Sequence, residues 1–154
     1  METTQLTRLD VERIYDALLA EKNSRDNPFM HAYGDIDAAI RNIVEMDRRG
    51  QVVKFRTPEN GLIGILIYDI VNFWWSDEPF FSEVLVLKTD PTFTGGFGRM
   101  AIRQMERIAK DNKCVGICSG CILERNAPMV TNMYKKAGFQ ITTANFVKDL
   151  RDEE

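Results

Sequence analysis

The sequence predicts an α/β fold in which a mixed, mostly antiparallel sheet carries helices on both faces. Runs with strand and helix periodicity follow one another in the order β-α-α-β-β-β-α-β-α-β. Strand 80–88, helix 96–111 and strand 115–119 form a βαβ unit, which is parallel and right-handed, whereas the hairpins before it are antiparallel. We expect one domain over residues 1–150 and a charged tail at 151–154.

The first elements are a short strand and two amphipathic helices. Residues 2–8 alternate weakly and predict the strand. Asp10 precedes an i, i+3, i+4 apolar stripe, which predicts that it caps a helix ending near Lys22. A second stripe lies between Asp35, a predicted N-cap, and Gly50, a predicted stop.

The rest of the chain alternates strands with helices. Residues 51–57 and 62–73 flank a Pro/Asn/Gly turn and predict a hairpin. After the βαβ unit, residues 126–137 predict a helix that Gly138 ends in the left-handed conformation. Residues 139–147 are expected to complete the sheet.

Composition excludes several classes of protein. The net charge is −3, and basic residues are clustered only in doublets, which argues against nucleic acid as a partner. No apolar run is long enough for a membrane helix, so no membrane association is expected. The N-terminus shows no secretory pattern, and we expect a cytoplasmic protein.

Three cysteines, Cys114, Cys118 and Cys121, lie close together in the sequence. An odd number is no disulfide framework, and a structural zinc site needs four ligands. The one histidine, His31, is far away in the sequence. We interpret the cysteines as small fillers of a buried strand and expect no metal.

A glycine-rich turn joins strand 80–88 to the next helix. Its sequence, Thr94-Gly95-Gly96-Phe97-Gly98-Arg99, leaves bare backbone at a helix start. Amides there have no partners within the helix and the helix dipole is positive, so a pyrophosphate can approach. The alternative is a tight corner packed against the sheet. A dinucleotide fingerprint is excluded because the G-x-G-x-x-G pattern is not completed.

A second pattern follows the βαβ unit. Asn126-Ala127-Pro128 is followed about two helical turns later by Tyr134 and then by Gly138-Phe139. These residues, the order of elements along the whole chain and the closing segment 146–150 resemble the GNAT superfamily of N-acetyltransferases. The resemblance implies a central pair of parallel strands that splay apart and bind acetyl-CoA.

The resemblance also implies which residues hold the cofactor. The pyrophosphate would lie on the glycine-rich turn, the pantetheine arm along the strand, and an asparagine would reach that arm. The residues are Val86, Leu87, Lys88, Thr94, Gly95, Gly96, Phe97, Gly98, Arg99 and Asn126. One departure is Phe93, which occupies the position where the family usually has Arg or Gln.

The activity implied is direct transfer of an acetyl group from acetyl-CoA to a primary amine of a small molecule or protein. Tyr134 is the candidate acid for the leaving thiolate. Its alternative role is a core aromatic. Glu83 is the candidate base, and its alternative is a solvent-facing or salt-bridged carboxylate. A backbone amide near Leu87 would stabilise the oxyanion.

The acceptor side is expected in two loops. Phe29 and His31 lie in the first and Trp74 and Trp75 in the second. The adjacent tryptophans predict a substrate wall or, preferably, the contact of a homodimer. Two other hypotheses stay open: a GNAT-like interaction or regulatory module with weak or no catalysis, and an acyltransferase acting on nucleic acid, which the acidic pI opposes.

Overall fold

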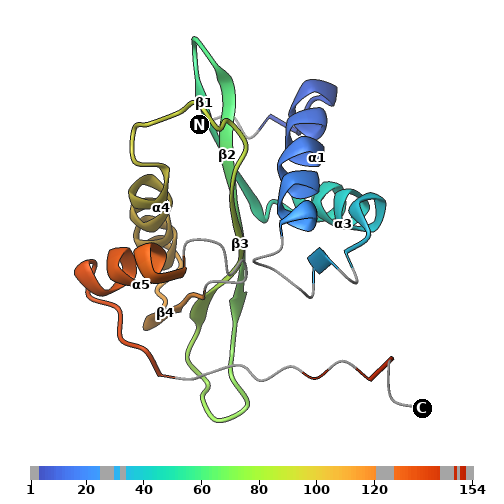
Figure 1. The fold of residues 1–154 in the computed structure, drawn as a ribbon. Helices are drawn as coiled ribbons and strands as arrows, with labels where there is room; N and C mark the ends of the chain where they lie inside the picture. Colours follow the sequence, from blue (N-terminus) through green and yellow to red (C-terminus); the bar gives the residue numbers. More distant parts are fainter. Residues whose placement is uncertain are drawn as a thin grey trace.

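The computed structural model describes residues 4–24, 30–31, 34–120, 127–142, 148 and 150–151. Helices α1 and α3 cover one face of a sheet and α4 and α5 the other (Figure 1). This is the α/β architecture that the sequence predicts. The elements are α1 (Arg8–Asn23), α3 (Ile36–Arg48), β1 (Val52–Thr57), β2 (Gly61–Val71), β3 (Phe80–Lys88), α4 (Phe97–Asp111), β4 (Gly116–Cys118) and α5 (Ala127–Lys136).

The four strands of the sheet have the order β1-β2-β3-β4. The first three are antiparallel, and β4 runs parallel to β3. The parallel pairing covers only Phe80–Ser82 of β3, which continues to Lys88 paired with β2 on one edge and with no described strand on the other. The two parallel strands therefore separate, and this leaves an unpaired edge on the second half of β3.

The last predicted β segment, 139–147, is not formed over residues 139–142. Residues 143–147 and 149 lie outside the described part of the chain, and these include most of the closing segment 146–150. In the part that is described, β4 is thus the terminal strand, and the parallel pair lies at one side of the sheet rather than at its centre.

A β-bulge interrupts β3. Ile67 of β2 pairs with Leu85. The next residue, Tyr68, pairs with Glu83, so Val84 is an extra residue in β3. Val84 and Leu85 both pack against the core beneath α1 and α3. The bulge therefore breaks the strand alternation immediately after Glu83, at the place where β4 leaves β3.

The two faces of the sheet have separate cores. The core under α1 and α3 contains Ile14, Leu18, Ile43, Ile65 and Ile67, among others. The core under α4 includes the following buried residues: Phe55, Ile63, Leu66, Phe81, Phe97, Ala101, Met105 and Ala109. Burial of both sheet faces explains why β2 is almost continuously apolar instead of alternating.

The N-terminal segment corrects two expectations. Residues 4–7 form no strand, and α1 begins at Arg8 with Thr7, not Asp10, as its N-cap. The Thr7 side chain accepts from the Asp10 amide, while the Asp10 carboxylate accepts from the Thr7 amide, which is a capping box. The amides of Thr7 and Asp10 are both satisfied in this way, so the helix starts about one turn before the predicted cap at Asp10. The predicted N-cap of α3, Asp35, is confirmed.

Candidate active site

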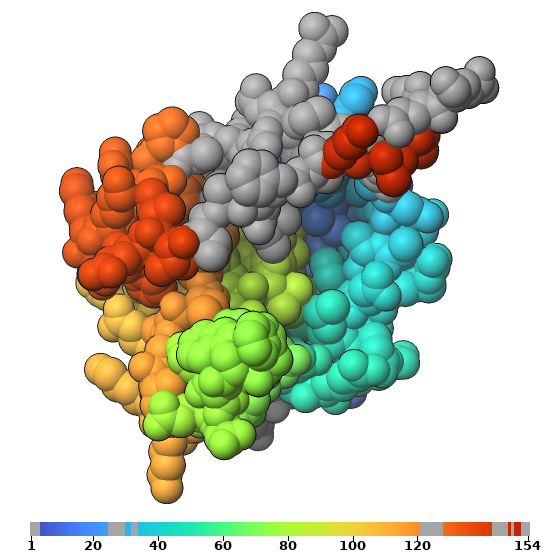
Figure 2. Space-filling model, turned by 90° about the horizontal axis from the view of Figure 1, so that it is seen from below, coloured from blue at the N-terminus to red at the C-terminus, as the bar shows by residue number. Residues whose placement is uncertain are grey.

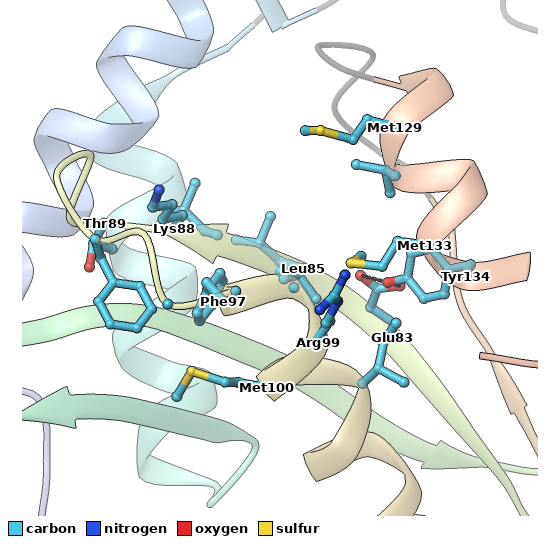
Figure 3. Close-up of a pocket in the computed structure, with 18 of the residues that line it drawn as sticks. Glu83, Leu85, Lys88, Thr89, Phe97, Arg99, Met100, Met129, Met133 and Tyr134 are labelled. Carbon is cyan, nitrogen blue, oxygen red and sulfur yellow. Dashed lines mark hydrogen bonds between the residues drawn. The ribbon is translucent and has the colours of Figure 1, made fainter. Parts of the chain in front are cut away.

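A cavity of about 1900 Å³ lies between the unpaired edge of β3, the turn before α4, and α5, and α1 also contributes to its wall (Figure 3). The residues predicted to hold the cofactor, where the structure describes them, share this cavity. They are Val86, Leu87, Lys88, Thr94, Gly95, Gly96, Phe97, Gly98 and Arg99. Glu83 and Tyr134 line it as well. Two regions far apart in sequence thus meet at one site.

Helix α4 begins with backbone amides that no side chain caps. Gly96 is the N-cap and has φ +77°, a left-handed conformation that favours glycine. Its side chain is absent, so the amides of the first turn receive no side-chain acceptor. The positive end of the helix dipole lies at the same place. This helix start can receive an anionic group from the cavity.

Phe97 anchors that helix start to the sheet. Its ring is buried and meets Phe55 edge-on, with 5.2 Å between the centroids. A Cβ at Gly64 of β2 would lie 2.3 Å from the Phe97 ring, so only glycine leaves room for it. The position of the turn therefore depends on a glycine in the second strand.

Packing explains two other glycines of the turn. A Cβ on Gly95 would lie 2.4 Å from the Phe93 ring, and one on Gly98 would lie 2.5 Å from the Met133 sulfur of α5. Phe93 is half-buried against the core under α4. Gly95 and Gly98 thus leave room for two side chains, Phe93 of the turn itself and Met133 of α5, and not for the sheet. This packing coexists with the exposed helix amides.

Glu83 and Tyr134 form a hydrogen-bonded pair at the cavity wall (Figure 3). The Tyr134 hydroxyl donates to the carboxylate, at 3.3 Å from Oε1 and 3.2 Å from Oε2. The Ser119 hydroxyl and the Gly120 amide also donate to Oε2. Burial raises the pKa of Glu83, although these hydrogen bonds oppose the shift. A carboxylate hydrogen-bonded to a phenol can accept and pass on a proton.

The C-terminus of α5 fixes Tyr134. Gly138 adopts φ +93°, as its predicted role requires. The Phe139 amide donates to the Tyr134 carbonyl and the Gly138 amide to the Lys135 carbonyl, which is a Schellman motif. The Phe139 and Tyr134 rings meet edge-on, with 5.1 Å between their centroids. The Gly-Phe pair thus orients the tyrosine ring.

Of the predicted acceptor residues, the structure describes His31, Trp74 and Trp75, and these lie away from the cavity. Phe29 of the acceptor side and Asn126 of the cofactor site lie outside the described residues. His31 is exposed, and its Nδ1 lies 2.9 Å from the Lys22 carbonyl. Trp74 and Trp75 lie in the β2–β3 loop, which projects from the face seen in Figure 2. None of the three appears in the cavity wall.

Sequence reasoning missed two segments that contribute to the site, the end of β4 and one side of α1. Ser119 and Gly120 follow a strand of three residues, too short to show which groups it faces. Asp16, Ala17 and Glu21 of α1 also line the cavity. The apolar stripe of α1 locates its buried face, but periodicity cannot show that the helix also borders a cavity beyond the edge of that face.

The described cysteines differ in part from the expected fillers of a buried strand, because Cys114 precedes β4 and β4 itself is half-buried. Cys114 and Cys118 are half-buried free thiols, and burial raises the pKa of each. Cys121 lies outside the described residues. Within the described chain, no group of three potential ligands is arranged to hold a metal ion. No described helix is both long enough and apolar enough to cross a membrane.

Comparison with known proteins finds similarity in structure but not in sequence. No family model matches the chain, and no curated protein matches it. A GNAT family acetyltransferase from Staphylococcus aureus is 14% identical, with a TM-score of 0.57 and 96% of each chain covered. AAC(6')-Iy in complex with the bisubstrate analogue CoA-S-monomethyl-acetylneamine is 13% identical, with a TM-score of 0.63 and 96% of each chain covered.

The same fold occurs in a transcriptional regulator from Bacillus halodurans, which is 12% identical with a TM-score of 0.66. The match covers 96% of this chain and 97% of the regulator. Identities this low establish architecture and not activity. Together with the splayed parallel strands and the order of elements, they show that the chain has the fold of the GNAT superfamily.

Proposed function

We propose that the protein is an acetyl-CoA-dependent N-acetyltransferase, formed by a single domain over residues 1–150, that acts on a primary amine. One observation carries the proposal. An uncapped helix start and the hydrogen-bonded pair Glu83–Tyr134 line the same cavity, with the unpaired edge of β3 between them. The fold supports it, since a protein with this fold binds an analogue linked to CoA.

The donor would lie along β3. The amides at the start of α4 suit the pyrophosphate, and the edge of Val86–Lys88 that faces away from β2 suits the amides of the pantetheine arm. Lys88, Arg99 and Arg103 line the same cavity and provide positive charge for phosphate groups. These features fit acetyl-CoA in charge and in hydrogen-bonding capacity.

Glu83 and Tyr134 then have complementary roles. Glu83 accepts the proton that the amine nitrogen loses as the new C–N bond forms. Tyr134 gives its proton to the sulfur as the C–S bond breaks. The proton on Glu83 then passes across the existing hydrogen bond to the tyrosine oxygen, which restores both groups. A neutral amine and a thioester become an amide and a thiol with no proton left over.

Ligand-induced stabilisation tests the donor half of the proposal. Acetyl-CoA at a hundred times its Kd should raise the free energy of unfolding by about 2.7 kcal/mol, measured by thermal unfolding. Release of thiol in the presence of a panel of small amines and N-terminal peptides then tests transfer. A melting temperature unchanged by millimolar acetyl-CoA would exclude this function.

One observation favours a second function. Phe93 packs on the core where GNAT enzymes usually have Arg or Gln, and its ring covers Gly95. A GNAT-fold interaction or regulatory module with weak or no catalysis fits this packing. Binding of acetyl-CoA without thiol release on any tested amine would support the module, whereas turnover would exclude it.

We also propose a homodimer contact at the β2–β3 loop. Trp74 and Trp75 are 96% and 61% exposed, and the Trp75 ring stacks on Phe73 at 5.4 Å between centroids. Exposed indoles at a loop tip favour a protein contact. Sedimentation of the wild type and of a Trp74→Ser, Trp75→Ser double variant measures it, and identical monomer fractions would exclude this interface.

A further inference from the structure

The end of β4 is bound to a side chain of β3. Backbone pairing between the two strands stops at Ser82 and Cys118. The next two residues of the β4 segment do not return to the β3 backbone. Instead, the Ser119 hydroxyl donates to Oε2 of Glu83, and the Gly120 amide donates to the same oxygen at 2.9 Å.

The Glu83 carboxylate therefore bridges the point where the parallel strands separate. A backbone amide at the end of a strand needs an acceptor once the ladder stops. For Gly120 this acceptor is a carboxylate oxygen instead of a β3 carbonyl. The β-bulge that follows Glu83 bends the strand at the same place. Separation of the strands and placement of the carboxylate are thus one structural feature.

The two carboxylate oxygens have different surroundings. Oε2 accepts from the hydroxyl of Ser119, the amide of Gly120 and, at 3.2 Å, the hydroxyl of Tyr134. Oε1 accepts in the described structure from Tyr134, at 3.3 Å. Oε2 is the anchored oxygen, and Oε1 retains capacity to accept a proton.

We infer that Ser119 is a positioning residue: with the Gly120 amide it holds Oε2 of Glu83, so that the carboxylate stays beside the Tyr134 hydroxyl and Oε1, which has fewer donors, is the proton acceptor. The catalytic meaning of this arrangement rests on the proposed function, but the placement itself does not. Removal of the Ser119 hydroxyl removes a hydrogen bond that favours the charged form of Glu83. The pKa of Glu83 should therefore rise.

Other titratable groups border the same cavity and belong to the electrostatic setting of Glu83. On α5 they are Tyr134 and Lys136, on α4 Arg99, Arg103 and Glu106, on β3 Lys88, and on α1 Asp16 and Glu21. The Ser119 variants leave all of them in place. A difference between these variants therefore reports on the hydroxyl.

The test is a carboxylate titration of the full chain without ligand. Glutamate labelled with ¹³C at Cδ is followed by NMR, and Glu83→Gln assigns the signal. In Ser119→Ala the pKa of Glu83 should rise by about one pH unit relative to wild type, and Ser119→Thr, which keeps the hydroxyl, should restore it. Equal Glu83 titrations in wild type and Ser119→Ala would overturn the inference.

A second measurement separates this inference from the proposed function. If an accepted amine is found, the acidic limb of kcat/KM should move to higher pH in Ser119→Ala and return in Ser119→Thr. A uniform loss of kcat with an unmoved limb would overturn the positioning role. If no amine is acetylated, the proposed acetyltransferase activity is excluded. A Glu83 titration that depends on Ser119 would still support the placement of Glu83.

Discussion

At the scale of single residues, Glu83 balances burial against hydrogen bonding. Burial disfavours the charged carboxylate, and three donors favour it. Burial is the larger effect, so the pKa of Glu83 is raised. The group therefore holds a proton more readily than an exposed glutamate.

This balance predicts the pH dependence of catalysis. Because Glu83 must be ionised to accept a proton, kcat/KM should rise with pH through its raised pKa, which lies above the ordinary value of 4.5. Glu83→Gln should remove that limb and lower the plateau about 100-fold or more. A pH–rate profile measures both effects. The same acidic limb in Glu83→Gln would assign it to another group.

Tyr134 gives the matching prediction for the leaving group. Tyr134→Phe keeps the ring contact with Phe139 but removes the donor, so kcat should fall about 100-fold or more while the affinity for acetyl-CoA is retained. Tyr15→Phe on the exposed side of α1 is the matched control and should have wild-type turnover. Full turnover in Tyr134→Phe would assign the acid to another group or to water.

At the scale of elements, the start of α4 depends on a contact across the sheet. The first helical residue, Phe97, fills the space that Gly64 leaves open in β2. The helix amides therefore face the cavity because an aromatic ring fixes the helix to the sheet. Local sequence around the turn supplies flexible glycines, but it does not supply this fixed position.

Gly64→Ala tests this dependence. The added methyl group would press on the Phe97 ring and on the Leu87 carbonyl, so we expect a loss of about 1–3 kcal/mol in the free energy of unfolding and weaker binding of acetyl-CoA. Denaturant unfolding and calorimetric titration measure the two effects.

Gly50→Ala provides the comparison for that experiment. Gly50 has φ +76° and open space around it. Substitution by alanine should therefore lower the free energy of unfolding by about 1 kcal/mol through backbone strain alone and leave cofactor binding unchanged. Equal cofactor affinity in Gly64→Ala and wild type would show that the α4 start does not depend on the Phe97 contact.

At the scale of the whole molecule, ion pairs join the layer of N-terminal helices to the edge strand β1. The Asp10 carboxylate of α1 accepts from the two terminal guanidinium nitrogens of Arg56, Nη1 at 2.7 Å and Nη2 at 2.6 Å. Asp47 at the end of α3 pairs with Lys54 of β1, and both side chains are buried. The Asp10–Arg56 pair joins residues 46 positions apart, whereas the Asp47–Lys54 pair joins α3 to the strand that follows it. Both pairs hold the helices against β1.

The Asp10–Arg56 pair predicts acid sensitivity. Burial raises the pKa of Asp10, but hydrogen bonds from Arg56 and Thr7 outweigh burial, and its pKa lies below 3.8 in the fold. Its contribution is present above that unfolded value and is lost as pH falls through the lower folded pKa. Because Arg56 is 34% exposed, we expect Asp10→Asn to lose only about 1.5–3 kcal/mol at pH 7.

Denaturant unfolding across pH checks this expectation. The difference in unfolding free energy between wild type and Asp10→Asn should shrink as pH falls below 3.8. Glu12→Gln on the exposed side of the same helix is the control, because its ion pair with Arg8 is exposed and should contribute little. A difference that stays constant down to low pH would mean that the Asp10 charge does not stabilise the fold.

The sequence by itself determined the features whose physical cause is local. Periodicity identified the helices and strands that make up the described sheet, because an amphipathic segment must turn its apolar side to the core. Turn and cap chemistry located Asp35 and Gly138, because helix caps and positive φ are properties of a few neighbouring residues. Thr7 and Asp10 also carried a readable signal, the capping box, which the apolar stripe obscured.

Only the tertiary structure decided how the site is assembled. The face that Glu83 presents depends on a bulge, and a bulge is fixed by pairing with β2 and not by the β3 sequence. Ser119 and Gly120 reach the carboxylate because β4 ends there, and Phe93 lies on the core because Gly95 leaves it room. Such contacts join residues distant in the chain, and their energies depend on neighbours that no local pattern specifies.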